Sequence, residues 1–160
     1  MQRMKDDVAV DDAPKSRLLV ADDDPAFRRA ISFLLQGSGY EVTEAVDGAS
    51  ANTALDHAWL EGRPYEILLV DIRMQAVSGW DVLRHALREV PAGGVRPRVL
   101  LVTGFAGETD HARARREGAS ALLTKPISCE VLLREIRRVA LIPRDIPAIH
   151  DASGHLTTTG

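Results

Sequence analysis

Residues 18–29, LLVADDDPAFRR, join a short apolar run to three consecutive carboxylates and then to the beginning of a helical pattern. The apolar residues 18–21 are typical of a strand buried on both faces, and Pro25 suits the first turn of a helix. Three aspartates at residues 22–24 concentrate repulsive charge where this strand ends. Such a triplet indicates a site that holds a cation, or acids that cap a helix N-terminus, and we expect Asp24 to be the cap.

The rest of the chain repeats this order of strand and helix. Apolar or alternating runs predict strands at 17–21, 40–45, 66–71, 97–103 and 121–124. Apolar residues at helical spacing predict helices at 26–36, 49–60, 80–90 and 128–140, and a weakly packed helix with only alanines to bury at 108–118. Strands that alternate with helices indicate a parallel sheet covered on both faces. We therefore expect a flavodoxin-like, doubly wound (βα)5 α/β domain with five parallel strands in the order 2-1-3-4-5.

The composition limits the classes of function. A chain of 160 residues that is 45% hydrophobic suits one globular domain with its own core. The net charge of −3 gives no general attraction to nucleic acid or to an anionic membrane. The single cysteine, Cys129, excludes a disulfide framework and a cysteine-rich metal site, and it agrees with a reducing cytoplasm.

The segments outside the repeating pattern carry no targeting signal. The N-terminus has no apolar run long enough for a signal peptide, and no stretch approaches membrane-spanning length. We expect a flexible acidic tail at 1–16, one domain at 17–140 and a C-terminal tail at 141–160. The last segment is too short for a helix-turn-helix, so we expect no DNA-binding domain, no membrane contact and a cytoplasmic location.

Complementary chemistry follows four of the predicted strands. The first ends in Asp22 and Asp23, the third in Asp71 and the fourth in Thr103, while Lys125 follows the fifth. In open parallel sheets, ligands bind at this carboxyl edge of the strands. Three close carboxylates repel one another unless a cation lies among them, and oxygen ligands alone favour Mg²⁺. A hydroxyl and an ammonium beside that ion are what a phosphoryl group needs.

In these residues the sequence resembles the receiver domain of bacterial response regulators, over residues 17–140. The resemblance rests on LLVADDDP, ILLVDIRM with SGWDVL, VLLVTG and GASALLTKP, in this order. It implies a two-component, His-to-Asp phosphorelay in which Asp71 takes a phosphoryl group from a phosphohistidine. The donor would be a sensor histidine kinase or a histidine phosphotransfer protein. The chain would then be a signalling phosphoacceptor that catalyses its own phosphoryl transfer and autodephosphorylation, and not an enzyme with separate substrates.

The resemblance also implies a ligand set for Mg²⁺. Asp23 and Asp71 would bind the ion directly, together with the backbone carbonyl of Arg73. Asp22 would act mainly through a water molecule on the ion.

The same resemblance implies how a phosphoryl group is held. Lys125 would contact a phosphoryl oxygen, and Thr103 would turn toward the phosphate. The bond between Lys125 and Pro126 would be cis, which is uncommon for X–Pro bonds in general. Arg73 and Phe105 would flank the phosphate and tune the lifetime of the phosphorylated state.

The sequence departs from the family pattern at two places. Gln75 and Ala76 stand where many receivers have Pro-Gly, which leaves the chemistry untouched. Leu122 stands where many carry Tyr or Phe, an aromatic residue that moves with the Thr and signals phosphorylation. The Leu122 substitution favours an alternative function, a phosphorylation-independent receiver-like interaction module. The complete set of acids, with Thr103 and Lys125, argues against that alternative.

Output is expected through the face of the last two helices and the strand between them. Six arginines lie on these helices: Arg113, Arg115, Arg116, Arg134, Arg137 and Arg138. They suit an acidic protein partner or a second copy of the domain, although arginines on a helix face are most often simply solvated.

An enzyme of the haloacid-dehalogenase type is the competing interpretation, because Asp22 and Asp24 have the spacing of its nucleophile motif. That family needs a further acidic pair at a later strand end, and none follows Lys125. It would also leave Asp71 without a role. A P-loop nucleotidase is excluded because no G-x-x-x-x-G-K-[ST] segment occurs.

Overall fold

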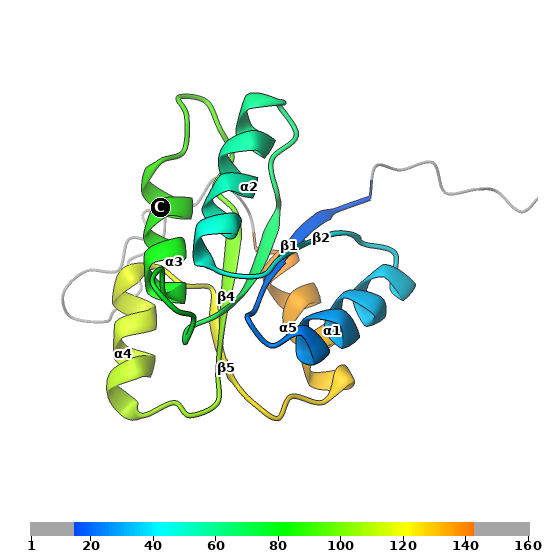
Figure 1. The fold of residues 1–160 in the computed structure, drawn as a ribbon, viewed down its shortest axis with the longest axis vertical. Helices are drawn as coiled ribbons and strands as arrows, with labels where there is room; N and C mark the ends of the chain where they lie inside the picture. Colours follow the sequence, from blue (N-terminus) through cyan, green and yellow to red (C-terminus); the bar gives the residue numbers. More distant parts are fainter. Residues whose placement is uncertain (1–14, 143–160) are drawn as a thin grey trace, which may run out of the picture.

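The computed structural model describes residues 15–142, and these form one sheet with helices on both sides (Figure 1). The five strands are parallel and lie in the order β2-β1-β3-β4-β5, which confirms the expected flavodoxin-like topology. The strands are β1 (Arg17–Ala21), β2 (Glu41–Ala45), β3 (Ile67–Asp71), β4 (Arg98–Thr103) and β5 (Ala121–Thr124). The helices are α1 (Pro25–Gly37), α2 (Gly48–Leu60), α3 (Gly79–Arg88), α4 (Glu108–Glu117) and α5 (Cys129–Ala140).

The expected tails at 1–16 and 141–160 fall outside the described residues, except for 15–16 and 141–142. Among the residues that the structure describes, none of the helices has the length and apolarity that a membrane crossing requires.

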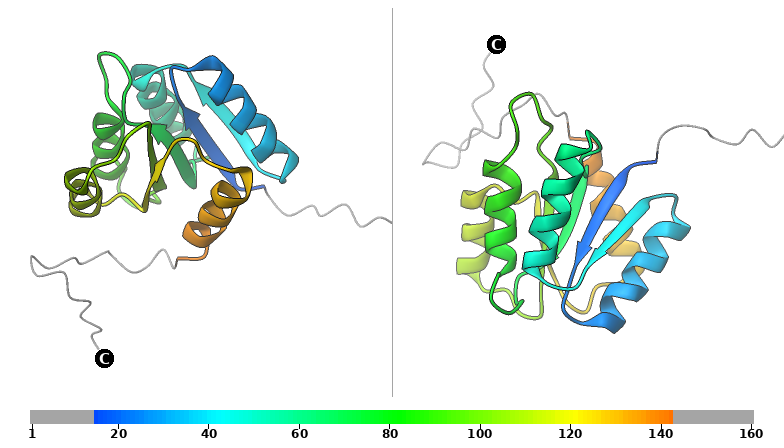
Figure 2. Two further views of the ribbon diagram at one scale, coloured as in Figure 1. Left: turned by 90° about the horizontal axis from the view of Figure 1, so that it is seen from below. Right: turned by 45° about the horizontal axis from the view of Figure 1, so that its top comes forward.

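Two apolar clusters form the core, one on each face of the sheet. Helices α1 and α5 cover one face, and α2, α3 and α4 cover the other (Figure 2). Successive strand residues point to opposite faces, so in β1 Leu18 and Val20 join the first cluster while Leu19 and Ala21 join the second. The continuous apolar runs of the sequence are therefore explained by burial of both faces.

The observed bounds differ from the predicted ones by at most two residues. Helix α1 begins at Pro25 because the Asp24 carboxylate accepts hydrogen bonds from the backbone N–H groups of Ala26 and Phe27, at 2.9 and 3.3 Å. The expected capping role of Asp24 is thus observed. Helix α3 ends at Arg88 and not at Val90, where the chain turns into a glycine-containing loop.

Packing is uneven across the sheet. All five residues of β3 are buried, whereas the four residues of β5, at the edge of the sheet, are half-buried or exposed. Helix α4 buries only Ala114, as its alanine-only pattern predicts. The carboxyl ends of β1 and β3 therefore rest on the most firmly packed part of the domain.

Candidate functional site

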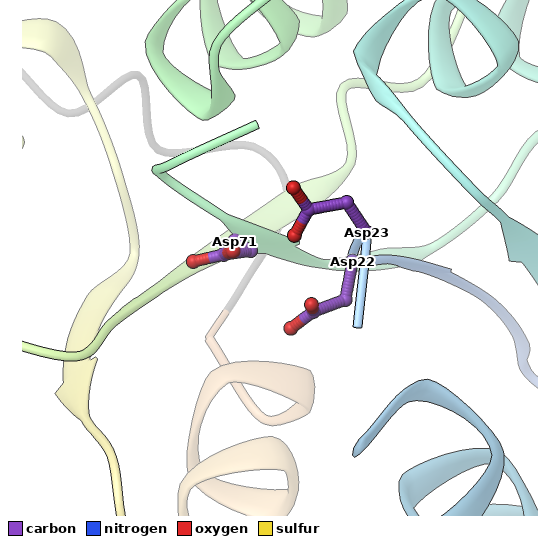
Figure 3. Close-up of side chains that lie close together, drawn as sticks. All are labelled: Asp22, Asp23 and Asp71. Atoms are coloured by element: carbon purple, nitrogen blue, oxygen red, sulfur yellow. The ribbon is translucent and has the colours of Figure 1, made fainter. Parts of the chain in front are cut away.

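Three carboxylates meet at the carboxyl edge of the sheet (Figure 3). Asp22 and Asp23 directly follow β1, and Asp71 is the last residue of the adjacent strand β3. One carboxylate oxygen from each lies within 4.8 Å of the others. Asp22 and Asp71 are buried, whereas Asp23 is exposed. Residues far apart in the sequence thus form one acidic group, because neighbouring parallel strands end at the same edge.

Asp22 is held from several directions. Its Oδ2 lies 2.7 Å from Lys125 Nζ, and its Oδ1 accepts a hydrogen bond of 2.8 Å from the backbone N–H of Asp24. Its carbonyl oxygen accepts a hydrogen bond of 2.8 Å from the Arg28 guanidinium, which also forms an ion pair of 2.9 Å with Glu44. The side chain is only 2% exposed, and these partners satisfy the polar groups that burial removes from water.

Asp71 lies in a less favourable environment for a negative charge. Burial, and after it the nearby Asp22 carboxylate, raise its pKa from the ordinary value of 3.8 to about 6, although Lys125 opposes this shift. The backbone N–H of Arg73 donates a long hydrogen bond of 3.4 Å to Asp71 Oδ1. The ionised form of Asp71 therefore lacks the stabilisation that Asp22 has, and a cation at the site would supply it.

The donor set fits Mg²⁺. Three carboxylates supply only hard oxygen atoms, and two of them are buried, where unbalanced negative charge is costly. Lys125 forms an ion pair with one member of the group, so one divalent ion would bring the charge of the three acids and this lysine to balance. Arg73, whose carbonyl is also an expected ligand, lies two residues beyond Asp71 in the loop that follows β3.

The loop after β3 approaches the acids closely. A Cβ atom on Gly79 would lie 2.4 Å from the carbonyl oxygen of Asp71, so no side chain fits there without a backbone shift. The N–H of Gly79 donates a hydrogen bond of 2.9 Å to the carbonyl of Ile72. Ala76 has a φ of 62°, the left-handed region that favours glycine, at the position where the sequence departs from Pro-Gly.

Lys125 reaches the acids from the connection between β5 and α5. The Lys125–Pro126 peptide bond is cis in the structure. The side chain is 23% exposed, and its backbone N–H donates a hydrogen bond of 2.7 Å to the carbonyl of Thr103. The ammonium also lies over the ring of Phe27, 4.0 Å from its centre.

Phe27 and Arg28 also contact the site, through Lys125 and through the carbonyl of Asp22. Neither residue belongs to a motif that the sequence shows at the strand ends. Only the first-turn position next to the acids could have suggested them, since the contacts depend on how α1 packs against the sheet.

Thr103 is buried, and its hydroxyl is engaged with the next loop. It donates a hydrogen bond of 3.0 Å to the carbonyl of Phe105 and accepts one of 3.4 Å from the N–H of the same residue. The side chain of Phe105 is 70% exposed. Leu122 is half-buried against the cluster that α2, α3 and α4 cover. Thr103 and Lys125 are thus linked through the backbone at the ends of β4 and β5, whereas Leu122 packs below this edge.

The six arginines of the expected output face are not equivalent. Arg113 forms an ion pair of 2.7 Å with Glu117 and lies 4.1 Å above the ring centre of Trp80. Arg138 forms an ion pair of 2.9 Å with Glu135 and donates to the carbonyl of Ser120. Like Arg138, the remaining four are exposed: Arg115, Arg116, Arg134 and Arg137.

Comparison with known proteins agrees with this geometry. A family profile described as the response regulator receiver domain matches residues 18–137. Protein PilH of Pseudomonas aeruginosa is 30% identical over 124 residues, which cover 78% of this chain and 97% of PilH. The chain spans only about half the length of some other curated relatives.

Solved structures give the same result. A CheY-like receiver domain protein from Methanospirillum hungatei has a TM-score of 0.67 and 26% identity, with coverage of 79% of this chain and 94% of that one. A response regulator from Burkholderia pseudomallei, with a phosphorylated aspartic acid, a calcium ion and citrate, has a TM-score of 0.65 and 27% identity. That match covers 79% of this chain and 69% of the other.

Proposed function

The chain belongs to the response regulator receiver domain family of two-component signalling, and we propose that it is a Mg²⁺-dependent phosphoacceptor in which Asp71 takes the phosphoryl group from a phosphohistidine. The observation that supports this most directly is the convergence of three carboxylates and one ammonium at the ends of β1, β3 and β5. A receiver-like module that only binds partners would not need this arrangement.

Asp71 is the proposed nucleophile. A bond forms between its carboxylate oxygen and the phosphorus, while the bond from the phosphorus to the donor histidine nitrogen breaks and its electron pair stays with the imidazole. Asp71 must be ionised to attack, and burial beside Asp22 disfavours that form. Mg²⁺, held by Asp23, Asp71 and the carbonyl of Arg73, with Asp22 acting mainly through a water molecule, would supply the positive charge that favours ionisation.

Lys125 and Thr103 act on the transferred group. The Lys125 ammonium would exchange its contact with Asp22 for one with a phosphoryl oxygen, and the Thr103 hydroxyl would release Phe105 to donate a hydrogen bond to another. Release of Phe105 would change the loop that precedes α4. We propose this loop, with Leu122 replacing the usual aromatic residue, as the connection to output.

The proposed partners follow from this chemistry. A sensor histidine kinase or a histidine phosphotransfer protein supplies the phosphoryl group. A downstream protein, or a second copy of the domain, binds the face formed by α4, β5 and α5, where five arginines are exposed. We place the domain at residues 17–140 and, because its proposed donors act there, in the cytoplasm.

The test is the intact mass of the protein after incubation with acetyl phosphate, with and without Mg²⁺. The wild type should gain one phosphoryl group only with Mg²⁺, and Asp71→Asn should gain none, because the amide is not a nucleophile while the shape barely changes. Asp24→Asn is the matched control, since Asn also caps helices and Asp24 lies outside the acidic group; it should be labelled like the wild type.

Two results would contradict the proposal. An adduct that persists in Asp71→Asn would remove Asp71 as the nucleophile. If neither acetyl phosphate nor a phosphohistidine donor labels the wild type, the phosphorylation-independent interaction module becomes the better explanation.

A further inference from the structure

The Lys125 ammonium lies between two groups that α1 and the preceding loop provide. Asp22 Oδ2 is 2.7 Å from Nζ, and the ring centre of Phe27 is 4.0 Å from it. A lysine side chain has four flexible bonds, so its charged end stays at one place only where partners hold it. Here one partner is charged and the other is the face of an aromatic ring, which attracts cations through its quadrupole.

We propose that Phe27 is a positioning residue that acts through Lys125, because its ring holds the ammonium at the rim of the acidic group, ready for an incoming phosphoryl group. This role rests on the proposed phosphoacceptor function. The ammonium has three N–H donors and uses one for Asp22, so it can contact a phosphoryl oxygen by moving toward that group. The contact with the ring requires no hydrogen-bond direction and persists while the ammonium moves across the ring face. Phe27 therefore restricts the movement of Lys125 to the neighbourhood in which it acts.

The ring of Phe27 is itself well held. It is half-buried and packs against the cluster that α1 and α5 cover. Its backbone N–H donates to the capping carboxylate of Asp24. The next residue, Arg28, is fixed by Glu44 and by the carbonyl of Asp22. The first turn of α1 is thus a rigid support on which the ring presents one face to the ammonium.

The competing explanation is that Phe27 only fills space in the core. Phe27→Leu separates the two explanations, because leucine keeps an apolar side chain of similar reach but has no aromatic face. Phe27→Tyr keeps the face. Phe33→Leu is the matched control, since Phe33 lies on the same helix, is 82% exposed and belongs to neither apolar cluster.

The experiment measures the initial rate of phosphoryl-adduct formation from acetyl phosphate with saturating Mg²⁺. Phe27→Leu should slow the reaction by about three- to tenfold, the effect of losing one partly buried cation–π contact. Phe27→Tyr and Phe33→Leu should react like the wild type. In a Lys125→Met background, Phe27→Leu should cause no further slowing, because the ring then has no ammonium to hold.

Equal slowing by Phe27→Leu in the wild-type and Lys125→Met backgrounds would overturn the proposal, as would a Phe27→Tyr variant as slow as Phe27→Leu. NMR provides an independent readout, because the Lys125 ε-methylene protons should show a ring-current shift in the wild type and in Phe27→Tyr but not in Phe27→Leu. Absence of that shift from the wild type would also overturn it.

A wild type that forms no adduct with acetyl phosphate or with a phosphohistidine donor would overturn the phosphoacceptor function and this role together. A retained ring-current shift would then identify a contact of structural importance only.

Discussion

The centre of the sheet, at β3, is packed more firmly than the edge formed by β5, and the candidate site draws on both regions. All five residues of β3 are buried, and Asp71 ends that strand; none of the four residues of β5 is fully buried, and Lys125 follows it. Helix α3 buries five residues, whereas α4 buries one. A group of like charges needs support that does not yield, while a segment that changes conformation must be inexpensive to rearrange. The acids stand at the firmly packed centre of the sheet, and the proposed output residues lie toward the loosely packed β5 edge.

The largest contrast in stability should come from truncating one leucine at the centre of the sheet and one at the β5 edge. Leu69→Ala in β3, where the side chain is 1% exposed, should lower the free energy of unfolding by about 3 to 4 kcal/mol through lost burial and the cavity left behind. Leu122→Ala in β5, where the side chain is half-buried, should cost about 1 kcal/mol. Urea denaturation measures both. Equal losses of unfolding free energy would show that the centre of the sheet and the β5 edge are packed alike.

Two glycines test the same comparison in the backbone. Gly79→Ala should cost about 3 kcal/mol, because the new Cβ would lie 2.4 Å from the Asp71 carbonyl and the loop must shift. Gly107→Ala before α4 should cost only about 0.5 to 1 kcal/mol, the difference between Gly and Ala as N-caps, since the nearest neighbour of the new Cβ would be 3.8 Å away. A Gly79→Ala variant as stable as Gly107→Ala would contradict the close approach of the loop to Asp71.

The charge of Asp71, at the end of the central strand β3, should make stability depend on pH in the absence of divalent metal. The folded protein holds the Asp71 proton with a pKa of about 6 instead of 3.8, so the wild type loses stability as the pH rises through this interval. Asp71→Asn carries no charge and should be more stable than the wild type above pH 6, by roughly 2 to 3 kcal/mol, and equally stable below pH 4.

Denaturation in EDTA from pH 4 to pH 8 measures this difference. Addition of Mg²⁺ should reduce it by stabilising only the wild type. A constant difference at every pH would contradict the raised pKa of Asp71.

The smallest expected effect concerns Ala76, in the loop that follows β3. Ala76 has a φ of 62°, and the Val77 N–H donates a hydrogen bond of 2.7 Å to the carbonyl of Gln75 across it. Ala76→Gly should stabilise the protein by about 0.5 kcal/mol, because relief of the strain exceeds the entropy that glycine adds to the unfolded chain. Gly104→Ala, in open space, is the reference for the reverse exchange. A destabilised Ala76→Gly variant would show that this turn is not strained.

Much of the candidate site could be predicted because it depends on strand ends. Asp22, Asp23, Asp71 and Thr103 each end or directly follow an apolar run, and parallel strands bring their carboxyl ends to one edge. The order 2-1-3-4-5 was expected because it is the common one among the few topologies that right-handed crossovers allow. The bounds were close for the same reason, since periodicity and capping residues act within a few positions of the chain.

The sequence by itself determined the parallel sheet and the set of groups at its carboxyl edge, because these follow from periodicity and connectivity, whereas it only limited the strand order to a few topologies. Only the tertiary structure decided that Arg28 is buried against the Asp22 carbonyl, that the Phe27 ring lies beside Lys125, and that Thr103 is engaged with Phe105. The same holds for the unequal environments of Asp22 and Asp71, two aspartates at equivalent strand ends. Each of these depends on how a helix or loop packs against residues far away in the chain. Hydrophobic spacing and local propensity involve only neighbouring residues, so they do not predict such contacts.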